Sequence, residues 1–135
     1  IKINKMNHLK FNSPKEYKGY SNSVEVDLGT CKMLIISGQV PFDEFGKLIS
    51  NDDLKKQTEQ VFKNILKLIE QSNGTIDSLV KLDFFVKDIS KIDEVRQVRD
   101  TFINKTSPPT STIVEVSNLF KRNILIEISA TAIIK

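Results

Sequence analysis

The sequence predicts an α+β domain in which two helices pack on one face of a mixed sheet of five or six strands. Two observations lead to this prediction. Several segments alternate apolar and polar residues or hold short unbroken apolar runs, and two others repeat apolar residues at a helical period. These segments follow one another in the order β-β-α-β-α-β-β, with a further strand possible at the front. The chain of 135 residues is long enough for one core and shows no linker or repeat, so residues 1–135 are predicted to form one domain.

The first predicted strands form a hairpin. Apolar and acidic residues alternate over 24–28, and an apolar run over 33–36 follows Gly29, which suits a tight turn. The small and polar residues 37–39 are expected to end the second strand. A short edge strand near 9–11 is the possible additional one.

The clearest helix follows the loop 41–50. Asp52 and Asp53 suit the positive end of the helix dipole, and Asn73-Gly74 suits a left-handed C-cap. The expected length of about 21 residues corresponds to roughly 31 Å. The face predicted to point inward holds Leu54, Thr58, Val61, Phe62, Ile65, Leu68 and Ile69.

A third strand is predicted within 76–87, a second helix over 92–103, and a fourth main strand over 112–116. Pro108-Pro109 separates the last two because proline cannot continue a helix. Val80, Leu82, Phe84 and Val86 are expected to share one face of the third strand, and Lys81, Asp83, Phe85 and Lys87 the other.

The final strand, Ile124 to Ile134, is apolar on both faces except for one carboxylate, Glu127. One face holds Ile124, Ile126, Ile128, Ala130, Ala132 and Ile134, and Glu127 lies on the other. A buried carboxylate without a partner is costly, so its site must hydrogen-bond it, keep it protonated or use it.

The two helices can cover only one face of the sheet, although the central and last strands are apolar on both. A second copy of the chain is the simplest cover for the other face, so a homo-oligomer is predicted. Glu127 then faces a cleft between subunits. The alternative is that Glu127 lies at a sheet margin, solvated or paired with a lysine or arginine.

Composition narrows the possible partners. The net charge of +3 comes from scattered residues, so nucleic-acid binding is permitted but not indicated. No apolar run reaches the roughly 18–20 residues that a membrane span needs. Cys31 is the only cysteine, which favours a reducing, cytoplasmic location. With one cysteine and one histidine, His8, no zinc site of the usual kind can form, and no metal is predicted.

The segment Ile36 to Pro41, ISGQVP, resembles the signature of the Rid family, the YjgF-type proteins also known as L-PSP endoribonucleases. The resemblance runs from about Tyr20 to the end of the chain. It continues through Gln57-Thr58, Val61, Asn64-Ile65, Phe85-Val86-Lys87-Asp88, Pro109 to Val116, Ile126-Glu127-Ile128, Ala130 and Ala132.

The resemblance implies a chorismate-mutase-like fold and a homotrimer with a cleft between each pair of subunits. It also implies hydrolysis of reactive enamines and imines, such as 2-aminoacrylate, to a 2-keto acid and ammonia without a metal or organic cofactor. Glu127 falls on the family's water-positioning glutamate. Tyr20, Ser37 and Gly38 fall on positions that line the cleft.

The chain departs from the family where a carboxylate-binding arginine is expected, because Ser111 stands there. A guanidinium holds a carboxylate with two charge-assisted hydrogen bonds, whereas a serine offers one neutral donor. Ile113 stands where the family often has cysteine, and Arg96 where the deaminases tend to have asparagine. One hypothesis is that Arg96 supplies the missing cation; the alternative is that Arg96 is a solvated helix residue.

Three functions follow from these observations. The first is an enamine/imine deaminase whose substrate choice is altered by Ser111. The second is a non-catalytic trimer that binds or senses a small molecule in the same clefts. A weaker third is an RNA-cleaving or translation-inhibiting protein, as the older family name suggests.

Overall fold

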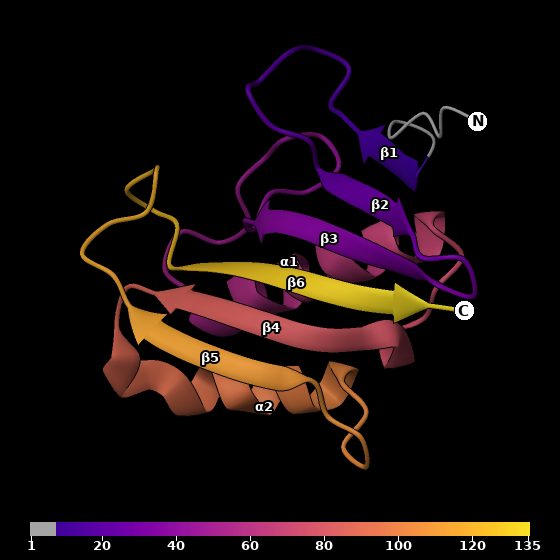
Figure 1. The fold of residues 1–135 in the computed structure, drawn as a ribbon. Helices are drawn as coiled ribbons and strands as arrows, with labels where there is room; N and C mark the ends of the chain where they lie inside the picture. Colours follow the sequence, from indigo (N-terminus) through magenta and orange to yellow (C-terminus); the bar gives the residue numbers. More distant parts are fainter. Residues whose placement is uncertain (1–7) are drawn as a thin grey trace.

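The computed structural model describes residues 8–135, and the first seven residues of the predicted 1–135 domain lie outside this part. The strands are β1 (Leu9–Asn12), β2 (Ser23–Asp27), β3 (Lys32–Gln39), β4 (Leu79–Val86), β5 (Thr110–Glu115) and β6 (Ile126–Ile134); the helices are α1 (Leu54–Gln71) and α2 (Ile92–Phe102). The strands form one sheet in the order β1-β2-β3-β6-β4-β5. Both helices lie on the same side of it (Figure 1). The predicted mixed sheet of five or six strands with two helices is confirmed, and the possible strand at the front is present.

The hairpin of β2 and β3 forms where the sequence predicts it. Gly29 has a positive φ of 92°, which a side chain would disfavour. The Leu28 N–H donates to the Cys31 carbonyl at 2.9 Å and closes the turn. β3 then pairs antiparallel with β6 at the centre of the sheet.

Helix α1 is capped at both ends. The Asp53 side chain accepts a hydrogen bond from the Lys56 N–H at 3.0 Å, which satisfies one of the donors left open at a helix start. At the other end Asn73 has a positive φ of 66°, and the Gly74 N–H donates to the Ile69 carbonyl at 2.9 Å. The helix therefore has 18 residues, fewer than the predicted 21.

The core lies between the two helices and the sheet. Phe62 of α1 stacks on Phe102 of α2, with 5.1 Å between the ring centroids. The buried apolar side chains that form one core cluster are Leu34, Ile36, Leu54, Val61, Phe62, Ile65, Ile69, Leu79, Leu82, Phe84, Val86, Val95, Ile126, Ile128, Ala130, Ala132 and Ile134. β6 alternates strictly between buried and half-buried residues, which confirms the predicted parity of the last strand.

The predicted face of β4 is wrong at Val80, because the pairing of β4 with β6 is irregular there. Leu79 lies opposite Ala132, but Lys81 lies opposite Thr131, so the register shifts between the two β4 residues. Val80 was expected to share a face with the buried residues that follow it at alternate positions and is instead 41% exposed, while Leu79 is buried in its place. A bulge inserts an extra residue and breaks the period of two on which the prediction rests.

Some strand boundaries also differ from the predictions. β3 ends at Gln39, within the predicted end at 37–39, with a register shift between Ile36 and Gln39. β5 begins at Thr110 and pairs parallel with β4, whereas β6 begins at Ile126. These shifts place Gly38 and Glu127 at the same end of the sheet.

The sheet face away from the helices is open in the single chain. Ile35 of β3 is 47% exposed there, and Val114 of β5 and Phe11 of β1 are exposed on the same face. The homo-oligomer that would cover this face stays a prediction.

Candidate functional site

Glu127 and Gly38 meet where β6 begins and β3 ends. A methyl group placed on Gly38 would lie 2.8 Å from Cδ of Glu127, well inside van der Waals contact. The absence of a side chain at Gly38 therefore makes room for the carboxylate. On the other side of β6, Phe85 lies directly opposite Glu127 in the antiparallel register with β4.

The surroundings of Glu127 disfavour its charged form. Desolvation raises the pKa of this carboxyl, and no hydrogen bond or ion pair among residues 8–135 counteracts it. The neighbouring side chain of Phe85 offers no polar partner, and Gly38 offers no side chain at all. The predicted alternative of a lysine or arginine paired with Glu127 is not seen among the described residues.

The position of Glu127 depends on a buried side chain to which the sequence analysis gave no role. Gln57 of α1 is fully buried. Its amide nitrogen donates to the carbonyls of Ser50, at 3.0 Å, and Asn123, at 2.8 Å. Its oxygen accepts from the Leu125 N–H at 2.8 Å, two residues before Glu127.

The signal for Gln57 was present in the sequence. It lies three residues after Leu54 and one before Thr58, so helical periodicity puts it on the inward face of α1. A buried amide on such a face must be hydrogen-bonded.

Tyr20 and Ser37 do not reach Glu127 directly within one chain. The Ser37 hydroxyl donates to the Ser21 carbonyl and the Ser37 N–H donates to the Asn22 carbonyl, so both groups fix the loop before β2. Tyr20 lies on that loop and lines a separate pocket. The family resemblance assigns Tyr20, Ser37, Gly38 and Glu127 to the cleft. Of these four residues, Gly38 and Glu127 lie side by side within one chain.

Ser111 and Ile113 point to the opposite face of the sheet from Glu127. Ser111 pairs with Leu82 and Ile113 with Phe84, and both partners face the helices. Glu127 lies on the face away from the helices, so one chain does not unite these residues in one site. A second copy is needed to bring Ser111 or Ile113 to Glu127.

Arg96 likewise lies on the helix side, on α2. Its guanidinium is exposed and pairs with Asp93 one turn earlier, with 3.2 Å between Nη1 and Oδ1. An exposed pair of this kind contributes little to stability, so the guanidinium can exchange partners. Within one chain Arg96 and Glu127 stay on opposite faces of the sheet.

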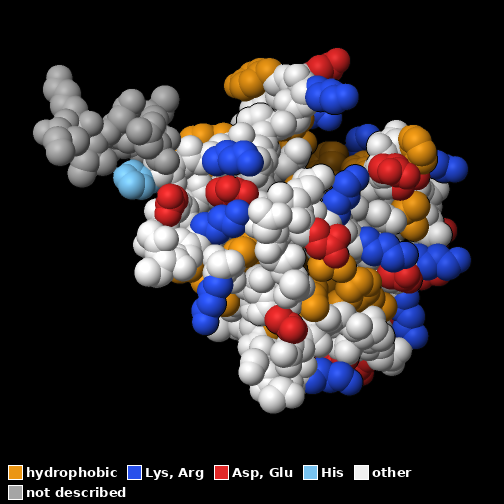
Figure 2. Space-filling view, turned by 90° about the vertical axis from the view of Figure 1, so that its right-hand side faces the viewer, with side chains coloured by type: hydrophobic (Ala, Val, Ile, Leu, Met, Phe, Trp, Pro, Cys, Tyr) orange, Lys and Arg blue, Asp and Glu red, His pale blue; other side chains and the backbone are white. Residues whose placement is uncertain are grey.

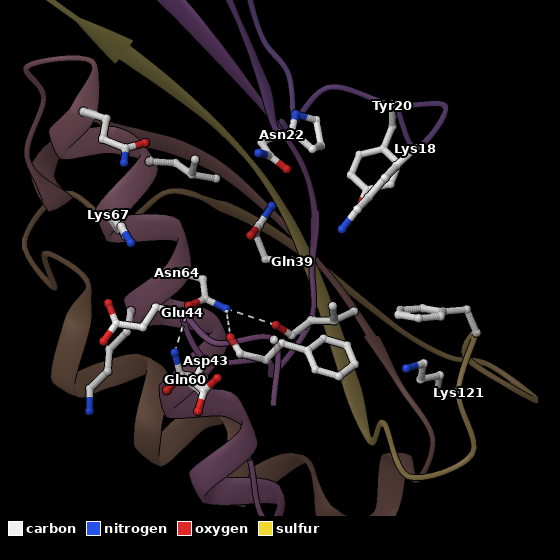
Figure 3. A pocket seen from close by; sticks show the side chains of 18 residues that line it. Lys18, Tyr20, Asn22, Gln39, Asp43, Glu44, Gln60, Asn64, Lys67 and Lys121 are labelled. Atoms are coloured by element: carbon white, nitrogen blue, oxygen red, sulfur yellow. Dashed lines mark hydrogen bonds between the residues drawn. The ribbon is translucent and has the colours of Figure 1, made fainter. Parts of the chain in front are cut away.

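A pocket lies next to the Glu127 site rather than around it. Its volume is about 930 Å³, and it opens between α1, the loop before β2 and the loop before β6 (Figure 3). Its lining includes Tyr20, Gln39, Phe42, Asn64, Phe120 and Lys121. Gln39 directly follows Gly38 in the chain, so the pocket and the carboxylate share one end of the sheet.

Residues 8–135 contain no cluster of three or more histidine, cysteine, aspartate or glutamate side chains able to hold a metal ion. None of the helices in this range is both long and apolar enough to cross a bilayer. Figure 2 shows one side of the molecule, where basic and acidic side chains are interspersed.

Comparisons with known proteins bring these features together. The model of the family described as Endoribonuclease L-PSP matches residues 11–134. A RutC family protein from Buchnera aphidicola is 36% identical over 124 residues, which are 90% of this chain and 91% of that protein. AldR from Lactococcus lactis, a candidate regulator, is 34% identical over 103 residues, covering 76% of this chain and 80% of AldR.

Solved structures agree with the family match. The crystal structure of the Rid family protein YyfA from Yersinia pestis superposes with a TM-score of 0.80 at 32% identity, covering 92% of this chain and 98% of that one. The resemblance inferred from ISGQVP and Glu127 is therefore confirmed. The chain belongs to the Endoribonuclease L-PSP family, the family of the Rid, YjgF and RutC proteins.

Proposed function

We propose that the protein hydrolyses reactive enamines and imines of the 2-aminoacrylate type to 2-keto acids and ammonia. The observation that carries this proposal is the Glu127 carboxylate, half-buried beside Gly38 with a raised pKa and no partner among the described residues. A carboxylate that has lost part of its hydration and faces no cation is a stronger base than one in water. Membership of the family supports the same reading.

The reaction needs one water molecule and one base. The enamine first tautomerises to the imine, and water then attacks the imine carbon while Glu127 takes a proton from that water. The electron pair of the C=N bond moves to nitrogen, which takes this proton from Glu127 and gives a neutral carbinolamine. The ionised Glu127 then removes the carbinolamine hydroxyl proton as the keto C=O bond forms and the C–N bond breaks, and passes that proton to the departing nitrogen, which leaves as ammonia.

The substrate carboxylate needs a partner that one chain does not supply beside Glu127. In the proposed homotrimer, residues of one copy would meet Glu127 of another in the cleft between the two copies. Ser111 would then offer a single hydroxyl where an arginine is expected, which weakens the grip on a small carboxylate and alters substrate choice. Arg96 of the neighbouring copy is the candidate replacement cation.

The test generates 2-aminoacrylate in situ with a dehydratase and measures keto-acid release in the presence of a trapping reagent. We expect the protein to accelerate release, and Glu127→Gln to lower the rate by at least about a hundredfold because the base is lost. Glu70→Gln, an exposed carboxylate at the end of α1, is the matched control and should keep the parent rate. Release at the buffer rate by the parent protein would refute the activity for this substrate.

Two further variants test which residue binds the substrate carboxylate. Ser111→Arg should raise kcat/KM for 2-aminoacrylate if the hydroxyl limits substrate positioning. Arg96→Ala should lower it if Arg96 replaces the arginine, whereas the exposed loop residue Arg122, changed to alanine, should not. Equal rates for the Arg96 and Arg122 variants would reject Arg96 as the cation.

A non-catalytic, small-molecule-binding regulator is the second candidate. The observation that favours it is Ser111 in place of the arginine, together with the similarity to AldR, a candidate regulator. An inactive parent protein that gains activity with Ser111→Arg would support this candidate. RNA cleavage, which the family's name suggests, receives no support from the interspersed charges in Figure 2.

A further inference from the structure

The pocket beside the Glu127 site has features that the proposed deamination does not use. At about 930 Å³ it lies near the upper end of the volumes that small-molecule sites occupy, roughly 300–1,000 Å³. A three-carbon imine would leave most of this space empty. Glu127 itself does not line the pocket.

One wall of the pocket is aromatic. The rings of Phe42 and Phe120 lie with their centroids 6.2 Å apart, and Phe120 is 65% exposed. Tyr20, also exposed, comes from the loop before β2 on another wall (Figure 3). Exposed aromatic rings grouped around one hollow are typical of a binding surface, because each offers a flat apolar face to a ligand ring.

The charged side chains around these rings are mainly lysines. Lys18, Lys63, Lys67 and Lys121 line the pocket, from the loop before β2, from α1 and from the loop before β6. Nζ of Lys121 lies 5.1 Å from the centroid of the Phe42 ring. Only Lys63 has an ion-pair partner among residues 8–135, and that partner is Glu59 on the outer surface of α1. The other three amines are therefore available to an anion.

Two carboxylates, Asp43 and Glu44, also line the pocket, but Asp43 is already engaged in hydrogen bonds. Oδ1 of Asp43 accepts hydrogen bonds from the N–H groups of Phe45 and Lys47, each at 2.9 Å, and so holds its own loop. Glu44 is exposed beside it. Lysines outnumber carboxylates around the pocket, so its local charge is positive.

The amide side chains of the pocket fix its shape. Asn64 of α1 donates to the carbonyls of Val40, at 3.0 Å, and Phe42, at 2.9 Å (Figure 3). Gln60 donates to the Asn64 oxygen at 2.8 Å. The segment that carries Phe42 is thereby tied to the helix, and the aromatic wall is held before any ligand arrives.

We propose that this pocket binds a small aromatic phosphate, a molecule of the size and chemistry of a mononucleotide. A flat ring would pack on the exposed Phe120, and the phosphate would lie on the side of the pocket that holds Lys18 and Lys121, with Lys67 on the opposite wall (Figure 3). Lysine amines are compact point charges that suit a phosphate, whereas a planar carboxylate is better matched by arginine, which the pocket lacks. Glu127 does not line this pocket, so the proposal does not rest on the deamination chemistry.

The test is calorimetric titration of the full chain with adenosine 5′-monophosphate. Phe120→Ala and Lys121→Glu should each weaken binding by about tenfold or more, because each removes a stacking ring or a phosphate partner. Phe45→Ala and Lys55→Glu are the matched controls: Phe45 is 87% exposed and Lys55 is exposed on α1, and neither lines the pocket. Both controls should bind as the parent does.

Two further measurements test which part of the nucleotide the pocket binds and whether nucleotide binding is independent of Glu127. Adenosine alone and inorganic phosphate alone should each bind more weakly than the nucleotide. Glu127→Gln should bind the nucleotide with unchanged affinity even though it loses deaminase activity. Undetectable binding at millimolar nucleotide, or equal affinities for the pocket variants and their controls, would overturn the proposal without affecting the deaminase hypothesis.

Discussion

At the scale of single residues, the close approach of Gly38 to Glu127 sets the properties of the site. The carboxylate occupies the volume that a side chain on β3 would fill. Its position beside Phe85 removes part of its hydration and raises its pKa. The burial of the carboxyl, rather than a charged or hydrogen-bonding partner, therefore raises its basicity.

Gly38→Ala tests this packing. The added methyl would approach Cδ of Glu127 to 2.8 Å and displace the carboxylate. We expect kcat/KM for the imine substrate to fall by about a hundredfold, since a displacement of about 1 Å can have this effect. The positive-φ strain that accompanies substitution at Gly29 does not apply at Gly38.

The matched control for Gly38→Ala is the stability of the double variant with Glu127→Ala, measured by urea unfolding. The added methyl has nothing to clash with once the Glu127 side chain is removed. The two substitutions should therefore be non-additive, and the double variant should be more stable than the summed effects of the single substitutions predict. Strict additivity would contradict a direct contact.

The raised pKa of Glu127 also predicts a pH-dependent stability. The folded state holds this proton more tightly than the unfolded state, so the contribution of the carboxyl is full below its unfolded pKa and is lost as the pH rises through the folded pKa. Glu127→Gln cannot ionise and avoids this loss. The Tm of the variant should therefore exceed that of the parent at neutral pH, with a smaller difference in acid.

Thermal scans of the parent and Glu127→Gln from acid to neutral pH provide the measurement. In parallel, the deaminase rate of the parent should fall on acidification, because only the ionised carboxylate accepts a proton. A Tm difference that stays constant over this pH range would argue against a desolvated carboxyl.

At the scale of elements, Gln57 joins α1 to the chain segment that enters β6. Gln57→Leu preserves the approximate volume but leaves the Leu125 N–H and the carbonyls of Ser50 and Asn123 without their partner. We expect a loss of about 2–4 kcal/mol in the free energy of unfolding, measured with urea, because unsatisfied buried groups cost about 1–3 kcal/mol each. The exposed Gln97, changed to leucine, should have little effect.

The elements also mark where sequence reasoning succeeds and fails. The alternation in β6 was enough to place Glu127 on the face away from the helices, because a regular strand has a fixed period. The same rule misplaced Val80, since a bulge in β4 depends on pairing with β6 and leaves no trace in a single strand. Gly38 was predicted as a site residue from the family resemblance, but its contact with Glu127 depends on the register of β3 and β6.

Gln57 and the lysine-lined pocket illustrate a second limit. The inward position of Gln57 follows from helical periodicity, but its partners Ser50, Asn123 and Leu125 are remote in sequence or lie in loops. Three separate segments supply Lys18, Lys67 and Lys121, and only the folded chain brings them together. The pattern of residues within one segment does not indicate how far that segment lies from another in the folded chain.

At the scale of the whole molecule, the open sheet face predicts self-association. Ile35 lies at the centre of this face and is 47% exposed in the single chain. Ile35→Lys places a charge there that association would have to bury, so light scattering should detect a smaller species than for the parent. Phe45→Lys, on a loop away from the sheet, should leave the size unchanged. A parent protein of monomer mass would refute the predicted oligomer.

The two edge strands of the sheet present few unpaired backbone groups to which another chain could add a strand. β1 has only four residues, and Pro108-Pro109 lies directly before β5 at the other edge. Short edges and adjacent prolines limit the row of unpaired backbone groups that could template fibril growth. A contact through the face closes into a finite ring when its rotation closes. We therefore expect copies of the chain to associate through the apolar face rather than by adding strands at the edges of the sheet.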